Sequence, residues 1–412
     1  MGEGNQLVRR LGLAQTTGIA LGAMIGAGVY VSLGEAAATT GGSLVLAVVI
    51  GALVAMLNGL SSAELGATDP RAGGAYEFGR EFLRPWVGFL AGWVFLLAAV
   101  AAGTTYALTF AAYLQPLMGV PVRWVGPALI FLGVLLNAAG VRVSATANLA
   151  LVGFSLAVLV AFVALTLPAF RLPALQPFLA GGAVGLLQAG ALLFFAYSGY
   201  ARPVTVAEEV KGPRSTLPKA VVAAVAVTLA LYLAVAAGGL GALGADGFGE
   251  ADAPLRQAVA VTGPAFAPTL LSAGALVASV TVLLTEIWGL SRLTFAMARG
   301  GDLPGWLAHL SGEDRIPRRA VLVVGAVLLV LASVLDLRPA LEASSLGLLV
   351  YYGIMNLSAL QLGPGERLYP RIIPALGAVS CALLALSLPA HTILVVTATA
   401  AVGMVYYALR RW

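Results

Sequence analysis

Two short segments of small and aromatic residues, each in the middle of a long apolar stretch, carry the first chemical signal in this sequence. They are GAMIGAG at residues 22–28 and FAYSGY at residues 195–200. Glycine weakens a helix by about 1 kcal/mol per residue relative to alanine and lets the backbone leave helical geometry. An interrupted helix presents free N–H and C=O groups, which a membrane interior tolerates only where they line a cavity or find partners.

Backbone groups presented at these two points would suit a zwitterion. The positive helix end near Gly26 to Gly28 could receive a carboxylate, and freed carbonyls of either segment could accept the hydrogens of an ammonium group. The alternative is close helix packing, because small residues at four-residue spacing, such as Gly22 and Gly26, also serve that purpose. The occurrence of two such segments, five spans apart, favours a binding site.

The elements that must position these segments are apolar spans that recur along the whole chain. Of the 412 residues, 60% are hydrophobic and 10% are charged, against about 25% charged in an ordinary soluble domain. Runs of about twenty apolar residues are long enough to cross a bilayer. The pattern predicts an all-α integral membrane protein of about twelve transmembrane helices. The predicted spans, numbered in order, are 13–38, 43–66, 85–114, 124–139, 145–167, 183–207, 217–240, 264–297, 320–335, 340–360, 372–388 and 391–409.

The distribution of basic residues predicts the topology, because Lys and Arg near span ends are retained in the cytoplasm. Arg123, Arg171, Arg256 and Arg338 fall on one side of the predicted membrane, and the rest of the 23 Lys and Arg residues fall on the other. We therefore expect a multi-pass protein of the cell inner membrane with both termini in the cytoplasm. The first ten residues show no signal-peptide cleavage site. A single transmembrane domain is expected over residues 1–412.

Several function classes find little support. The net charge of +5 is dispersed among loops, so no nucleic-acid partner is expected. The lone Cys381 excludes an intrachain disulfide framework or a cysteine-based metal cluster. His309 and His391 are predicted on opposite sides of the membrane and form no catalytic set. A membrane-embedded enzyme and a channel remain as alternatives. No cofactor, no resident metal and no obligate protein partner are inferred, and the lipid bilayer is the expected surrounding.

A series of short motifs follows along nearly the whole chain: GAG at 26–28, AEL at 63–65, PRAGGAY at 70–76, GFLAGW at 88–93, FFAYSGY at 194–200, EEV at 208–210 and AMAR at 296–299. Their order and spacing resemble the amino acid–polyamine–organocation (APC) permeases, especially the branch related to cationic amino acid transporters. The resemblance implies a leucine-transporter-like 5+5 inverted repeat with broken helices 1 and 6. The repeats would cover approximately residues 11–168 and 180–362, with peripheral helices at approximately 370–410.

The same resemblance implies which residues bind substrate: Met24, Gly26, Ala27 and Gly28 in span one, and Phe195, Ala196, Tyr197 and Ser198 in span six. Phe195 would gate the outer side of the site, or else it is an ordinary core phenylalanine. The implied activity is secondary active transport of L-amino acids by alternating access.

Substrate choice is predicted from the lining of this site. The residues implied there are small or aromatic, and no acidic residue is placed to meet a cationic side chain. Neutral, small to medium amino acids are therefore favoured as substrates. Transport of cationic amino acids or polyamines, and a uniport or exchange mechanism, are the alternatives.

The coupling ion is the least constrained feature. Many members of this family carry a lysine in span five whose ammonium group takes the place of a sodium ion between spans one and eight. Ser155 stands at that position here, so the lysine mechanism does not transfer. The pocket could hold Na⁺ through Ser155, carbonyls near Gly22, and Ser279 or Thr281, or it could stay uncharged. Serine and threonine also bond to their own helix backbone. The coupling ion is thus Na⁺, H⁺ or none.

Glu286 lies in the middle of span eight, where an ionisable group is costly and therefore a candidate for function. One interpretation is a structural ion pair with Arg292, about one and a half helical turns later. The other is a proton-binding carboxylate. Glu64, and Glu208 with Glu209, are expected to pair with loop arginines such as Arg71 or Arg292. Arg202 is expected to extend toward the cytoplasm or to join this acidic network.

Overall fold

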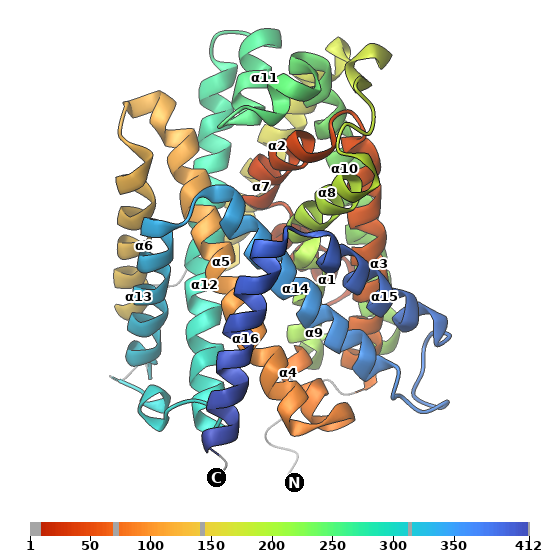
Figure 1. The fold of residues 1–412 in the computed structure, drawn as a ribbon, viewed down its shortest axis with the longest axis vertical. Coiled ribbons are helices and arrows are strands. Elements are labelled where there is room, and N and C mark those ends of the chain that lie inside the picture. The colour runs from red at the N-terminus through yellow and green to blue at the C-terminus, as the bar shows by residue number, and fades with distance from the viewer. Residues whose placement is uncertain (1–9, 69–73, 141–144, 312–314, 411–412) are drawn as a thin grey trace.

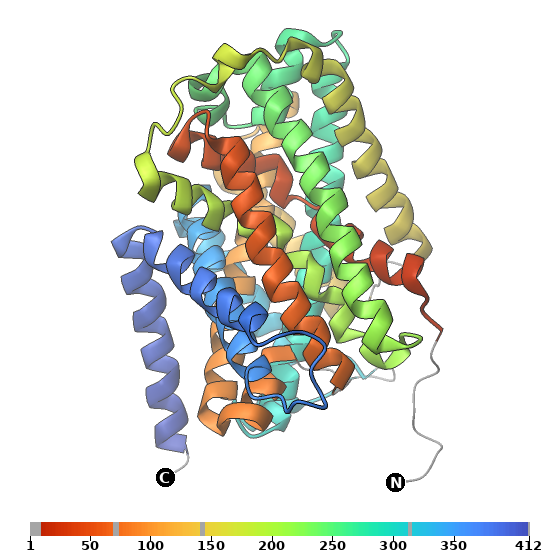
Figure 2. The same cartoon turned by 90° about the vertical axis from the view of Figure 1, so that its right-hand side faces the viewer.

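The computed structural model describes residues 10–68, 74–140, 145–311 and 315–410. Within these ranges the secondary structure is helical, with isolated β-bridges and no strand. Figures 1 and 2 show most of the long helices running together along the long axis of the molecule, so the chain forms one helical bundle. The prediction of an all-α protein is confirmed for the described residues.

The long helices follow the predicted spans closely. In chain order they are α1 (Leu13–Met24), α2 (Gly28–Thr40), α3 (Leu44–Thr68), α5 (Pro85–Met118), α6 (Val122–Ala138), α7 (Ala145–Thr166), α8 (Gly182–Tyr197), α10 (Pro213–Gly249), α12 (Ala267–Arg299), α13 (Arg318–Val334), α14 (Leu337–Ala359), α15 (Ile372–Ser387) and α16 (Ala390–Arg410). Helix α10 extends nine residues beyond the predicted end of span seven at Leu240, with non-helical backbone at Gly244 (φ 72°, ψ 175°).

Shorter elements connect them. They are α4 (Gly74–Phe78), the π-helical η2 (Gly79–Leu83), the 3₁₀ turns η3 (Leu167–Ala169), η4 (Leu172–Leu175), η5 (Ser198–Ala201), η6 (Ala207–Glu209) and η7 (Gly305–Ala308), and the helices α9 (Arg202–Thr205) and α11 (Pro254–Thr262). Figure 1 places α11 at one end of the bundle and α4 at the opposite end, near the last turn of α16.

Length and composition make many of these helices fit to cross a membrane. Among the described residues, seven helices are long and apolar enough, and the bent pair α1–α2 brings the number to eight. Two shorter apolar helices, over Arg123–Ala138 and Ile372–Ser387, add to the apolar bundle. The total of about twelve spans and the 5+5 repeat stay predictions.

Span one is broken where its glycine-rich segment predicts a break. Helix α1 ends at Met24, α2 begins at Gly28, and the two are bent by 52°. The N–H of Ile25 donates to the carbonyl of Leu21 at 2.8 Å and closes the last turn of α1. Figure 2 shows α1, in red, strongly tilted at the side of the bundle, whereas α3 runs along it. The break therefore redirects the first half of the span.

Span six is interrupted more gently. Its α-helix ends at Tyr197, a 3₁₀ turn covers Ser198–Ala201, and α9 follows directly from Arg202. The stretch Gly182–Thr205 still qualifies as one 24-residue apolar span. The interruption is thus a change of helix type, which leaves carbonyls at the end of α8 without their usual α-helical partners.

Candidate functional site

The interrupted segments of spans one and six lie directly against each other. A Cβ atom added to Gly199 would lie 2.4 Å from the carbonyl carbon of Ala23 and 2.6 Å from the backbone nitrogen of Met24. One added to Gly28 would lie 3.2 Å from the Cα atom of Ala196. The first two distances leave no room for a side chain, so glycine at position 199 is required by the contact between the two backbones.

The eight residues predicted to bind substrate lie at this contact or next to it in the chain, and nearly all are shielded. Met24, Ala27, Phe195, Ala196 and Tyr197 are at most 5% exposed, Gly26 and Gly28 are buried, and Ser198 is partly exposed. A Cβ atom at Gly26 would lie 2.9 Å from a methyl group of Val282 in α12, so span eight closes on the same break.

Tyr232 of α10 joins the two breaks, although the sequence offered no prediction for it. The single O–H of its buried hydroxyl is shared between the carbonyl oxygens of Met24, at 2.7 Å, and of Ala196, at 3.2 Å. Both carbonyls lie where a helix ends and intrahelical donors run out. A tyrosine in an apolar span needs a partner for its hydroxyl, and this need was the signal in the sequence that could have pointed to Tyr232. One side chain therefore holds both interrupted spans.

Aromatic rings surround the contact. The rings of Phe195 and Tyr106 in α5 lie 5.5 Å apart, and those of Tyr197 and Tyr232 lie 5.0 Å apart. The hydroxyl of Tyr352 in α14 donates to the carbonyl of Ser198 at 3.3 Å. Phe195 thus packs on an aromatic neighbour at the break, an arrangement that suits both a gate and a core residue.

Among the described residues, the two breaks pack directly against each other. Phe195 and Ala196 approach within about van der Waals contact of the space beside Gly28, and Tyr232 occupies the freed carbonyls. Of the two cavities described below, one touches the break of span one at Ile25 and Gly26 but has no lining residue from span six, and the other lies away from both breaks. A ligand at this site therefore requires spans one and six to move apart.

The first of these cavities lies between α1, α7 and α12. It is lined by Gly22, Ile25, Gly26, Leu151, Val152, Ser155, Ala278, Thr281 and Val282. Three residues of the predicted ion site, Gly22, Ser155 and Thr281, are among them. The Thr281 hydroxyl donates to the Val277 carbonyl at 2.8 Å, and Ser155 is 2% exposed. The negative end of α1 lies beside the cavity, which favours a cation over an anion.

Ser279, the fourth residue of the predicted ion site, does not line this cavity. Its hydroxyl is buried, and no partner is present for it among the described residues. One residue of helix is a rotation of about 100°, so Ala278 rather than Ser279 faces the space. Among the described residues, no group of three or more His, Cys, Asp or Glu side chains could hold a metal ion.

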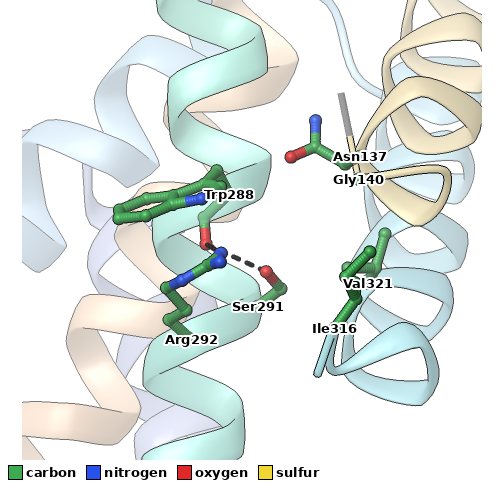
Figure 3. Close-up of a pocket in the computed structure, with 7 residues that line it drawn as sticks. All are labelled: Asn137, Gly140, Trp288, Ser291, Arg292, Ile316 and Val321. Atoms are coloured by element: carbon green, nitrogen blue, oxygen red, sulfur yellow. Dashed lines mark hydrogen bonds between the residues drawn. The ribbon is translucent and has the colours of Figure 1, made fainter. Parts of the chain in front are cut away.

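The second cavity lies at the side of α12, away from the predicted sites. Figure 3 shows its lining of Asn137, Gly140, Trp288, Ser291, Arg292, Ile316 and Val321, contributed mainly by α6, α12 and α13. The guanidinium of Arg292 lies 3.8 Å from the ring centre of Trp288. The Ser291 hydroxyl donates to the Trp288 carbonyl at 2.9 Å. Arg292 thus faces this groove.

Glu286 pairs with Arg202 and not with Arg292 as the structural interpretation expected. The Arg202 guanidinium lies 3.4 Å from the Glu286 carboxylate. Six residues separate Glu286 from Arg292, a rotation of about 600°, which places the two side chains on different faces of α12. Arg202 directly follows the interrupted turn of span six, so the pair links spans six and eight.

Glu64 has backbone partners. Its Oε1 atom accepts hydrogen bonds from the backbone N–H groups of Leu368 at 2.5 Å and Tyr369 at 3.0 Å, in the loop before α15. Arg71, one of its two expected partners, lies outside the described residues. Glu64 therefore anchors the end of α3 to that loop.

A polar cluster closes the end of the bundle near α4. The buried Asp302 accepts hydrogen bonds from the hydroxyl of Tyr76 at 2.7 Å and from the guanidinium of Arg80. Burial, reinforced by the bond to Asp302, raises the pKa of Tyr76 well above its usual range, so its hydroxyl stays a donor at neutral pH. The loop after α12 is thus tied to the segment between α3 and α5.

Comparison with known proteins gives a consistent result. Residues 11–409 match the family model described as amino acid permease. An uncharacterized transporter of Mycobacterium tuberculosis is 40% identical over 99% of this chain and 92% of its own length. The branched-chain amino acid permease BcaP of Bacillus subtilis is 27% identical over 98% of this chain and 93% of its own. The vacuolar cationic amino acid transporter 4 of Arabidopsis thaliana is 27% identical over 87% of this chain and 64% of its own.

These matches confirm the resemblance to APC permeases that the short motifs indicated. The family and the named relatives are transporters, which excludes the enzyme alternative. Apolar helices long enough to cross a bilayer and a match over nearly the whole chain point the same way. The chain is an integral membrane protein and belongs to the amino acid permease family.

Proposed function

We propose that this protein carries neutral, small to medium L-amino acids across the membrane by alternating access, using the interrupted spans one and six as its substrate site. The observation that carries the proposal is the hydroxyl of Tyr232, which bonds to the freed carbonyls of both Met24 and Ala196. These carbonyls lie within apolar spans, where unpaired polar groups are costly. A site that binds an ammonium group needs acceptors of this kind.

In the proposed binding mode, the substrate carboxylate meets the N-terminus of α2, whose first N–H groups begin at Gly28. The substrate ammonium group donates to the carbonyls of Met24 and Ala196, which Tyr232 releases as spans one and six move apart. Binding and closure are therefore coupled, since the substrate replaces a contact that otherwise holds the two breaks together.

Substrate preference is inferred from the side chains around the breaks. Ala27, Ala196 and Phe195 offer apolar contact, and Glu286, the carboxylate in span eight, is already paired with Arg202. A neutral side chain suits this lining better than a cationic one. The name of the Bacillus subtilis relative, a branched-chain amino acid permease, agrees with this preference. The Arabidopsis relative's name keeps cationic amino acids as the second candidate.

The cavity at Gly22, Ser155 and Thr281 is the candidate site for a coupling cation. The hydroxyls of Ser155 and Thr281 and the carbonyls at the end of α1 would supply neutral oxygen ligands. Sodium would fill the place that a lysine takes in many relatives and would hold α1 against α7 and α12. If the cavity takes no cation, the protein works as an exchanger or a uniporter.

For the architecture we propose the leucine-transporter-like 5+5 arrangement with about twelve transmembrane helices. The helix order, with the break between α1 and α2 and the 3₁₀ turn after α8, supports it. Symport across the cell inner membrane, with both termini in the cytoplasm, belongs to the same proposal.

Proteoliposomes test the function. Purified protein is reconstituted, and uptake of labelled amino acids is measured singly, with sodium or proton gradients imposed and with unlabelled substrate inside. We expect saturable uptake of leucine, isoleucine, valine or alanine, acceleration by internal substrate, and little uptake of arginine, lysine or putrescine. Preference for the cationic set would reverse the substrate assignment. Uptake that does not saturate would favour a channel.

A further inference from the structure

The ion pair between Arg202 and Glu286 lies directly beside the interruption of span six. Arg202 is the first residue of α9, immediately after the 3₁₀ turn that interrupts span six. Glu286 lies near the middle of the 33-residue helix α12, which forms span eight. The pair therefore fastens the part of span six beyond its break to a long, unbroken helix.

This pair is more loosely built than the buried cluster around Asp302. Arg202 and Glu286 share one contact of 3.4 Å among the described residues, and the Arg202 side chain is 41% exposed. Asp302, by comparison, binds both Arg80 and Tyr76. A single long contact to a half-exposed arginine is weak and easily opened.

Opening this contact has a large local consequence, because Glu286 is only 12% exposed within an apolar span. A carboxylate that loses its partner there is strongly disfavoured and takes up a proton. Two stable arrangements follow: a paired carboxylate, and a protonated carboxyl group without Arg202. In the second, a proton from water adds to a carboxylate oxygen. When Arg202 returns, the O–H bond breaks, its electron pair stays on oxygen, and the proton leaves to water.

The neighbours of the pair connect it to the substrate site. Tyr106, whose ring packs on Phe195, interacts electrostatically with both Glu286 and Arg202. Tyr351 and Tyr352 of α14 interact electrostatically with Arg202. Among the described residues, Arg202 and Tyr106 are the titratable or charged groups of other helices that interact with Glu286. On its own helix, Arg292 turns toward the groove lined by Trp288 (Figure 3).

We propose that the Arg202–Glu286 pair is an inner latch, which closes the path below the substrate site and must open and reform in each transport cycle, with Glu286 protonated while the latch is open. This proposal rests on the proposed transport function. Arg202 and Glu286 act here as positioning residues. They hold the segment after the break in place and need not touch the substrate.

Three variants isolate the latch. Glu286→Gln keeps the shape of the side chain but removes its charge, so the latch is permanently weakened. Glu286→Asp keeps a titratable carboxylate and provides the conservative rescue. Glu250→Gln makes the same chemical change at an exposed position that follows α10, and serves as the matched control.

The first measurement needs no substrate. Hydrogen exchange of residues 198–206 is followed in the purified protein from about pH 8 to about pH 5, corrected for intrinsic exchange. In the unsubstituted protein we expect exchange of this segment to rise by at least about threefold as Glu286 becomes protonated. In Glu286→Gln, exchange of this segment should be fast and independent of pH. In Glu286→Asp, exchange should still rise as the pH falls, and in Glu250→Gln it should match the unsubstituted protein.

The second measurement follows amino acid exchange in proteoliposomes. Arg202→Glu and Glu286→Arg should each lower the exchange rate by more than about tenfold, and the double charge reversal should recover to within about threefold of the unsubstituted protein. Size-exclusion profiles and melting temperatures check that each variant is folded.

The outcomes separate the two proposals. If Glu286→Gln leaves the pH profile of segment 198–206 unchanged, or if the folded double reversal recovers nothing, the latch is overturned even when transport is intact. If the unsubstituted protein exchanges no amino acid but segment 198–206 behaves as expected, the proposed transport function fails, and what stands is the proton-dependent opening of the Arg202–Glu286 pair without its role in a transport cycle.

Discussion

At the scale of single residues, hydroxyl groups distinguish the candidate sites. Tyr232 places one hydroxyl on two carbonyls from different spans, and Ser155 with Thr281 places two hydroxyls beside the end of α1. Each is neutral, which lets a charged solute be bound without an opposite charge buried permanently in the membrane. The candidate chemistry of this protein thus rests on neutral oxygen atoms and helix ends.

Replacing Tyr232 by phenylalanine is expected to lower amino acid exchange at least about tenfold and to reduce stability by about 1 kcal/mol, because the carbonyls of Met24 and Ala196 lose their donor. The control is Tyr30→Phe. The Tyr30 hydroxyl is buried and has no partner among the described residues, so its removal should leave stability equal or slightly higher. Exchange assays and thermal unfolding measure both effects, and equal behaviour of the two variants would contradict the role given to Tyr232.

Replacing Ser155 by alanine tests the cation cavity. If sodium binds there, uptake driven by a sodium gradient should fall at least about tenfold in Ser155→Ala, while exchange at saturating sodium falls less, since the loss of one oxygen ligand weakens sodium binding first. Ser279→Ala is the control, because Ser279 does not line the cavity. Sodium-independent uptake, unchanged by Ser155→Ala, would remove sodium from the mechanism.

At the scale of elements, the contact between spans one and six depends on glycine at a few positions only. A Cβ atom at Gly199 would meet backbone atoms of Ala23 and Met24 at 2.4 and 2.6 Å, and backbone cannot turn aside as a flexible side chain can. At Gly18, in the same α1 helix, a Cβ atom would meet nothing within 4 Å. Packing therefore requires glycine at position 199 but not at position 18.

Gly199→Ala is accordingly expected to abolish transport or to lower it more than about thirtyfold, because the two breaks can no longer close on each other. Gly18→Ala should keep transport and raise the melting temperature, since alanine favours the helix by about 1 kcal/mol. Uptake and thermal unfolding of the two variants decide the matter. Comparable transport in both would place the closure of the site elsewhere.

At the scale of the whole molecule, the arrangement of charge along the bundle defines its ends. The cluster of Asp302, Arg80 and Tyr76 lies at the end that carries α4, whereas Arg338 pairs with Glu342 in the first turns of α14. Most other arginines belong with the first end in the predicted topology. The predicted orientation in the membrane is based on this segregation.

Single cysteines test that orientation. Cys381 is buried and is replaced by alanine to give a background without thiols. A cysteine at Lys219, beyond span six, should react with an impermeant maleimide only in inside-out vesicles, and one at Asp252, between α10 and α11, only in right-side-out cells. The reverse labelling pattern would invert the topology, and labelling of both positions from one side would change the number of spans between them.

The apolar runs in the sequence by themselves predict most of the helices of this protein. Twelve predicted ranges match the long helices to within a few residues at most ends, because a run of apolar residues of membrane length has few other stable conformations. The glycines of residues 22–28 located the break of span one, and short motifs identified the family. These properties are local in the chain, so the order of residues is enough to predict them.

Only the tertiary structure decided which side chains meet. It placed Tyr232 between two breaks, gave Glu286 the partner Arg202 in place of Arg292, and left Ser279 outside the cation cavity. Each outcome depends on the rotation of one helix against another, and one residue of error turns a side chain by about 100°. Helix rotation is set by packing between segments distant in sequence, and a run of apolar residues that is hydrophobic on every side contains little information about it.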